Sequence, residues 1–117
     1  MGDLGEEAVA RWYERVGYVV LDRNWRCNIG EIDIVTRADA TIVFCEVKTR
    51  SSDAFGSAFE AVTAAKQRRL RRLAARWLAQ AKGMEGPRSF DEVRFDVAAV
   101  TINRGSGPEI EVLEAAF

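Results

Sequence analysis

Residues 31–50 read EIDIVTRADATIVFCEVKTR, and this stretch decides the fold. It holds two β-rich runs, 31–36 and 41–49, which the short polar segment 37–40 separates. Two such runs joined by a short link are typical of an antiparallel β-hairpin. Two carboxylates and a lysine interrupt runs that otherwise resemble interior strands: Asp33, Glu46 and Lys48. Charged groups in apolar surroundings are costly unless they are paired, so their presence requires a reason.

Patterns outside the hairpin predict two helices and three further strands. In chain order we expect a helix from Asp3 to about Val16, a strand over 17–21, a polar connection over 22–28, a loop over 51–57, a helix capped by Thr63 and reaching about Lys82, and strands over 92–102 and 109–113. The order α-β-β-β-α-β-β predicts an α/β fold in one domain over 1–117, with a mixed central sheet flanked by helices. The sheet is expected to be mixed because hairpins pair antiparallel, whereas a helical crossover permits a parallel neighbour.

Composition excludes several classes of chemistry. The 117 residues include no histidine, which excludes serine and cysteine triads, zinc proteases and nucleases with a histidine base. The two cysteines lie in different segments without C-x-x-C spacing, so we expect free thiols in a cytoplasmic protein. No run approaches the roughly 18 apolar residues of a membrane helix. Any hydrolysis must therefore depend on carboxylates, lysine, backbone groups and a hard metal ion, with no organic cofactor.

The three charged residues of the hairpin are predicted to converge. Side chains alternate along a strand, so Asp33 shares a face with Glu31, and Glu46 with Lys48. A turn at about 38–39 would place Asp33 opposite roughly residues 44–45, with Glu46 as its diagonal neighbour. Mg²⁺ prefers oxygen ligands, often one or two carboxylates, and leaves positions for water and a phosphate. The simpler alternative is an ion-pair ladder on a solvated face, because the spacing D…E-x-K is short and common.

Both predicted helices carry charged residues that could lie near these strands. No carboxylate lies between Glu60 and Glu85, so the arginines of the second helix form an unpaired basic face opposite its apolar residues. Such a face suits a phosphate backbone, although a basic run can equally be a solvated surface. On the first helix, Glu6 falls at the border of the apolar stripe while Glu7 falls on the opposite side. We expect Glu6 to lean towards the sheet.

Five segments in order resemble the YraN-like family of small bacterial proteins: GEEA at 5–8, NWR at 24–26, GEID at 30–33, FCEVKTR at 44–50 and KQRRL at 66–70. The resemblance runs through nearly the whole chain. That family is similar to the PD-(D/E)-x-K nuclease superfamily, which has the restriction-endonuclease-like fold, and to archaeal Holliday-junction resolvases. The resemblance therefore implies this fold and a metal-dependent nuclease.

The resemblance also implies roles for individual residues. Catalytic residues would be Asp33, Glu46, Lys48 and Gln67. Ligands of Mg²⁺ or Mn²⁺ would be Glu6, Asp33, Glu46 and the carbonyl of Val47. Phosphate contacts are expected from Arg26, Arg50, Lys66, Arg68, Arg69 and Arg72. Ile32 stands where the superfamily motif has proline, a departure that many superfamily members share.

Three hypotheses remain open from the sequence, the third of which is a scaffold that recruits DNA-processing partners. The first is an endonuclease that hydrolyses phosphodiester bonds of DNA, with branched or damaged DNA as the candidate substrate. A resolvase cuts two strands symmetrically, so this hypothesis also predicts a homodimer. The second is a non-catalytic nucleic-acid-binding module on a nuclease-like fold, because a fold does not fix a function.

Overall fold

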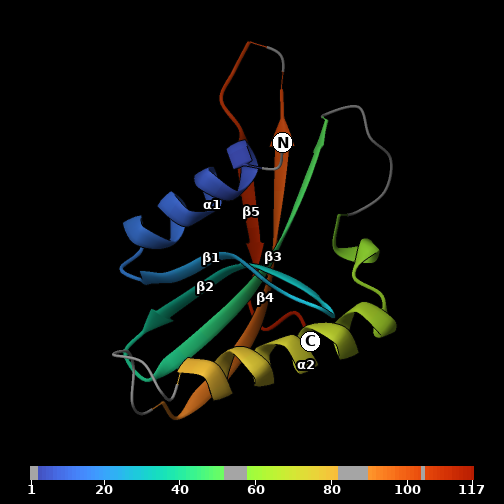
Figure 1. Cartoon of the computed structure of the whole chain (residues 1–117). Coiled ribbons are helices and arrows are strands. Elements are labelled where there is room, and N and C mark those ends of the chain that lie inside the picture. The colour runs from blue at the N-terminus through green and yellow to red at the C-terminus, as the bar shows by residue number, and fades with distance from the viewer. Residues whose placement is uncertain (1–2, 52–57, 82–89, 104) are drawn as a thin grey trace.

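The protein was analysed as a computed structural model, which describes residues 3–51, 58–81, 90–103 and 105–117. Its elements are α1 Asp3–Arg15, β1 Val19–Cys27, β2 Gly30–Ala38, β3 Thr41–Ser51, the 3₁₀ turn η1 Ala58–Ala61, α2 Ala64–Ala81, β4 Glu92–Ile102 and β5 Glu109–Leu113 (Figure 1). This order confirms the predicted α/β fold with a mixed sheet. No helix within the described ranges is long and apolar enough to span a bilayer.

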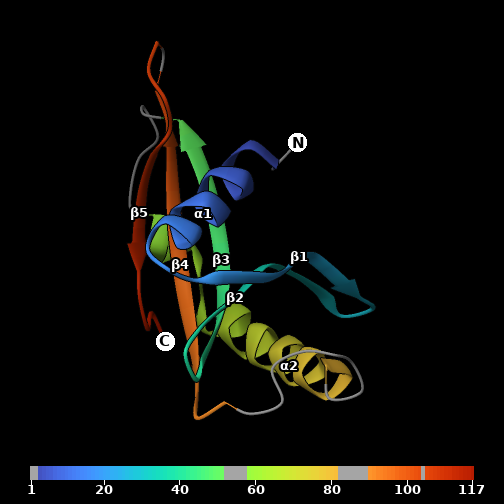
Figure 2. The ribbon, with the colours of Figure 1, turned by 90° about the vertical axis from the view of Figure 1, so that its left-hand side faces the viewer.

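The five strands form one sheet in the order β1-β2-β3-β4-β5. Every neighbouring pair is antiparallel except β3 and β4, which run parallel over the register Thr41–Glu92 to Ser51–Ile102. That parallel pair follows from the crossover through α2, as predicted. The ribbon of β1 and β2 turns away from the other three strands (Figure 2).

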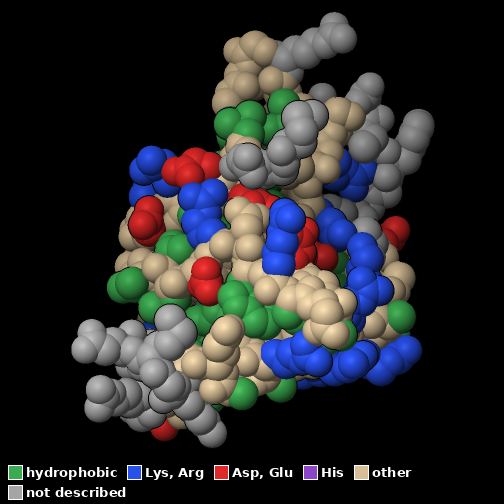
Figure 3. All heavy atoms as spheres, viewed as in Figure 1, with side chains coloured by type: hydrophobic (Ala, Val, Ile, Leu, Met, Phe, Trp, Pro, Cys, Tyr) green, Lys and Arg blue, Asp and Glu red, His purple; other side chains and the backbone are tan. Residues whose placement is uncertain are grey.

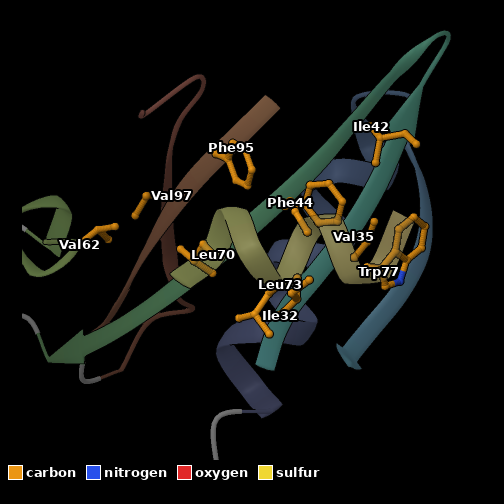
Figure 4. Packing of buried hydrophobic residues seen from close by; sticks show 11 residues of the cluster. Ile32, Val35, Ile42, Phe44, Val62, Leu70, Leu73, Trp77, Phe95 and Val97 are labelled. Atoms are coloured by element: carbon orange, nitrogen blue, oxygen red, sulfur yellow. The ribbon is translucent and has the colours of Figure 1, made fainter. Parts of the chain in front are cut away.

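The helices cover opposite faces of the sheet because alternate residues of β3 and β4 point to opposite sides. On one face α2 buries Leu70, Leu73 and Trp77 against a cluster that includes Phe44 and Phe95 (Figure 4). On the other face α1 packs against a second cluster: Val9, Ala10, Tyr13, Ile34, Val43, Cys45, Ala98 and Val100. Each strand of the pair therefore contributes to two cores.

The first strand is longer than predicted. The expected polar connection over 22–28 is wrong, because β1 continues to Cys27 and pairs with β2 as far as Gly30. Several side chains of this segment form hydrogen bonds with α2. Asp22 accepts a hydrogen bond of 3.0 Å from the indole of Trp77, and Trp25 donates one of 2.9 Å to Gln80.

Local predictions at two turns can be compared with the structure. Thr63 caps α2, since its Oγ1 accepts a 3.3 Å bond from the Lys66 amide. The β2–β3 turn was expected at 38–39, but Ala38 pairs with Thr41, so the turn residues are 39–40. Asp39 adopts a positive φ of 52° there. The predicted loop over 52–57, the end of α2 at Lys82 and the side chain of Asp3 lie outside the described residues.

Candidate functional site

The candidate site begins where β2 separates from β3. Paired residues run from Ala38–Thr41 to Ile34–Cys45, and the pairing ends there. The next residues in line are Asp33 and Glu46, one position further than the sequence predicted because the turn is one residue later. Beyond that point the Val47 amide of β3 bonds to a side chain of β2 instead of its backbone: Asp33 Oδ2 accepts a 2.8 Å hydrogen bond from this amide.

Asp33 and Glu46 form a close pair of carboxyl groups just beyond the last paired residues of β2 and β3. Two carboxylates that close together repel, which disfavours ionisation. Burial and the neighbouring Glu46 raise the pKa of Asp33 to about 8. The Val47 amide opposes that rise, and Glu6 adds to it. Without a cation, Asp33 therefore holds its proton more strongly than an ordinary aspartate does.

Two lysines stand beside this pair. Lys48 Nζ lies 3.6 Å from Glu46 Oε2, and the two side chains are 25% and 16% exposed. Lys66, from the first turn of α2, contacts Lys48, and the repulsion lowers the pKa of Lys66. Glu46 opposes this fall in the pKa of Lys66, and Arg69 adds to it. The site thus places two ammonium groups against one carboxyl pair.

The first helix brings Glu6 to the site through a close contact with β3. A Cβ built on Gly5 would lie 2.2 Å from Thr49 Oγ1, so only glycine lets the start of α1 approach this strand. Glu6 is buried beside the cleft, with 9% exposure, as its place at the edge of the apolar stripe predicted. Glu7 instead pairs with Arg11 at 2.9 Å and Arg23 at 2.6 Å.

These groups line an open cleft of about 310 Å³. Its lining residues are Glu6, Glu31, Asp33, Glu46, Val47, Lys48 and Thr49. We call it the carboxylate cleft. Because the N–H and C=O of one strand residue point to the same side, the Val47 carbonyl faces the cleft with its amide. The cleft therefore offers two carboxylates and one carbonyl oxygen to a hard cation.

The fit of a divalent ion can be judged from these donors. Within the described ranges, no three acidic, cysteine or histidine side chains are close enough to enclose a metal ion. The role of Glu6 as a third carboxylate ligand therefore stays a prediction. Mg²⁺ needs no such enclosure, because it commonly binds one or two carboxylates and keeps several waters. A cation would also relieve the repulsion that keeps a proton on Asp33.

The remaining predicted residues lie outside the carboxylate cleft. Gln67 donates from Nε2 to the Val62 carbonyl at 3.2 Å, so its amide is held by the residue that follows η1. Arg50 is half-buried near the end of β3. Arg68, Arg69 and Arg72 are exposed on α2, where blue side chains form a continuous row in Figure 3. Arg26 pairs with Glu31 at 3.0 Å.

Sequence reasoning missed three features of the site. Thr49 lines the cleft, and no sequence pattern distinguishes it from other strand threonines. The Gly5 approach has a weak local indication, since glycine inside a helix otherwise costs stability. Lys66 was expected to contact phosphate, but its position against Lys48 depends on how α2 packs on the sheet.

The comparisons agree on one family. The model of a family described as "Uncharacterised protein family UPF0102" matches residues 5–100. The chain is 50% identical over 117 residues to a UPF0102 protein of Frankia alni, covering 100% of this chain and 93% of that relative. It is 51% identical over 113 residues to a UPF0102 protein of Beutenbergia cavernae, covering 97% and 92% respectively. A UPF0102 protein of Rhodococcus opacus is 43% identical over 117 residues, with coverage of 100% and 95%.

Proposed function

This chain belongs to the uncharacterised protein family UPF0102, and we propose that its carboxylate cleft hydrolyses phosphodiester bonds of nucleic acid with Mg²⁺ or Mn²⁺. The observation that carries the proposal is that Asp33, Glu46 and Lys48 line one cleft, with Lys48 Nζ 3.6 Å from Glu46 Oε2. Two carboxyls forced together beside two lysines are unfavourable for stability alone, whereas they suit a site that exchanges a proton for a hard cation.

Each residue has a distinct task in this proposal. Asp33 and Glu46 hold the cation from two strands, and the Val47 carbonyl supplies a third oxygen. The cation lowers the pKa of bound water and neutralises charge that develops on the phosphate. Lys48 is positioned to orient the attacking water or to bind a non-bridging phosphate oxygen. Its ion pair with Glu46 holds the ammonium group at the cleft, so the side chain already favours the rotamer that this task needs.

The polyanionic substrate is supported by the distribution of charge. The whole chain has a net charge of only −1, yet α2 contains no acidic residue. Its basic residues begin at Lys66, beside the catalytic pair, and continue along the exposed side of the helix. A phosphate backbone bound along α2 would therefore lead directly to the cleft. The resemblance to Holliday-junction resolvases favours branched DNA and a homodimer that cuts two strands.

A cleavage panel tests the proposal. Labelled four-way junctions, flaps, nicked duplexes, single strands and RNA would be incubated with Mg²⁺, Mn²⁺ or a chelator. We expect metal-dependent cleavage that Asp33→Ala and Lys48→Ala each reduce by about 10² or more, the scale of lost acid–base or electrostatic groups. Asp91→Ala, at an exposed carboxylate, is the matched control and should retain activity.

Two results would overturn the assignment in different ways. Cleavage that survives both substitutions would place the chemistry elsewhere. Absence of cleavage on every substrate, together with tight binding, would favour the non-catalytic nucleic-acid-binding module. Binding without chemistry should then be independent of metal, because only the carboxylate pair requires a cation.

A further inference from the structure

A second cleft adjoins the carboxylate cleft at the tip of the β1–β2 hairpin. It has a volume of about 340 Å³ and is lined by Arg26, Cys27, Gly30 and Glu31. We call it the hairpin-tip cleft. Glu31 lines both clefts, so the two are neighbours along β2. The volume falls in the range of roughly 300–1,000 Å³ that small-molecule sites occupy.

The hairpin tip is held against α2 at several points. A Cβ on Gly30 would lie 3.4 Å from both Arg69 Cδ and Leu73 Cδ1, an ordinary packing distance, so these α2 side chains lie next to the hairpin tip. Arg76 donates a hydrogen bond to Asn28. The Trp25 indole bonds to Gln80 one turn further along the helix. These contacts hold the hairpin tip against α2.

A line of positive charge connects the two clefts. It starts at Lys48 in the carboxylate cleft and passes to Lys66, whose pKa both Lys48 and Arg69 lower. The side chain of Arg69, one turn further along α2, lies next to Gly30 of the hairpin tip, and Arg26 is on the same hairpin. Like charges along a line are unfavourable in the free protein, and consecutive phosphates would compensate them. The line therefore suggests the path of a strand from one cleft to the other.

The Arg26–Glu31 ion pair lies at the junction of the clefts. The two residues face each other in the β1–β2 register, and their charged atoms are 3.0 Å apart. Their side chains are 75% and 46% exposed, so the pair contributes little to stability and can open at small cost. An arriving phosphate competes with Glu31 for the guanidinium, which binds phosphate in a bidentate manner.

We propose that the hairpin-tip cleft receives an unpaired nucleotide next to the phosphodiester held in the carboxylate cleft, with Arg26 on its phosphate. This proposal rests on the proposed function and specifies its substrate. A paired base is stacked and directed at its partner strand, so it cannot enter a cleft beside the backbone path. The expected substrates thus carry unpaired residues at the cut: single strands, flaps or branch points.

The thiol of Cys27 provides a direct probe of occupancy. It lines the hairpin-tip cleft and is half-buried, whereas the second thiol, Cys45, is 1% exposed in the core. Alkylation of Cys27 by iodoacetamide, followed by mass spectrometry, would be measured in Ca²⁺ with a short single-stranded oligodeoxynucleotide, an oligoribonucleotide, a duplex or a mononucleotide. Both single-stranded probes should slow alkylation by about fivefold or more, and the duplex by less than about twofold, because only an unpaired nucleotide can enter the cleft and cover the thiol. The mononucleotide shows whether the cleft needs the adjoining strand.

Affinity measurements give a second, independent test. Arg26→Ala should weaken binding of a flap or single strand by about tenfold, and that of a duplex by less than about twofold, the scale of one lost phosphate contact. Arg11→Ala is the matched control, because Arg11 also forms an exposed pair with a glutamate, at 2.9 Å, but lies on α1 away from both clefts. Its binding should be unchanged.

The results distinguish failure of this proposal from failure of the proposed function. Cleavage with unchanged Cys27 alkylation and a neutral Arg26→Ala would refute the nucleotide site and leave the nuclease intact. Protection of Cys27 without any cleavage would support the nucleotide site and reject catalysis. Equal protection by duplex and single strand would overturn the requirement for an unpaired residue.

Discussion

Replacing Asp33 by asparagine should stabilise the metal-free protein while removing its response to metal. Keeping a proton on Asp33 at pH 7, instead of losing it at the ordinary value of 3.8, costs about 4 kcal/mol of folding free energy. Part of that cost is relieved when water enters the open cleft, so we expect a gain of about 1–3 kcal/mol for Asp33→Asn. For a domain of this size the melting temperature should rise by roughly 4–12 °C.

The geometry favours this substitution because asparagine can satisfy both partners of Asp33. Its carbonyl oxygen can accept the Val47 amide, which now bonds to Oδ2 at 2.8 Å. Its amide nitrogen can donate to Glu46, where the wild type sets two carboxyl groups against each other. The pair of Glu46 with Lys48 is left in place.

The gain must depend on pH with a definite sign. The folded-state pKa of Asp33 is raised, so its contribution to stability is full below 3.8 and is lost as pH rises through about 8. Asp33→Asn should therefore match the wild type at about pH 4 and exceed it increasingly towards pH 8. Thermal unfolding followed by circular dichroism across this range measures the difference.

The control is Asp91→Asn, at an exposed aspartate, which should be neutral at every pH. Addition of Mn²⁺ completes the assay: it should raise the melting temperature of the wild type, since binding to the native state alone stabilises it, and leave Asp33→Asn unchanged. A gain that is the same at pH 5 and pH 8, or a loss at pH 8, would refute this account of the Asp33 pKa.

Three further predictions follow from contacts elsewhere in the fold. Gly5→Ala should cost about 1–2 kcal/mol of folding free energy through its clash with Thr49 Oγ1. In the background of Thr49→Ala the same change should become neutral or favourable by up to about 1 kcal/mol, because alanine is the better helix former. A double-mutant cycle by urea unfolding measures both effects. Asp96→Asn should destabilise by about 3 kcal/mol, since it removes the negative charge and one of the two oxygens that accept the bonds of 2.9 and 3.0 Å from the half-buried Arg94; retained stability in denaturant titration would contradict it. Leu73→Ala, in the α2 core, should cost about 2–5 kcal/mol by the same measurement, and a smaller loss would mean that α2 packs loosely.

The sequence by itself determined the elements of the hairpin over 31–50 and the faces of its neighbouring helix. Alternation along 31–36 and 41–49 depends only on backbone geometry, so it correctly grouped Glu46 with Lys48. The helical period placed Glu6 towards the sheet for the same reason.

Only the tertiary structure decided how these elements meet. The polar segment 22–28 became a strand because two of its side chains form hydrogen bonds with Trp77 and Gln80, which lie over 50 residues away in the sequence. The separation of β2 from β3, which lets Asp33 reach the Val47 amide, depends on sheet twist that no local pattern encodes. Likewise, Lys66 stands beside Lys48 because of the angle at which α2 packs, and that angle is set by the shapes of buried side chains on both elements.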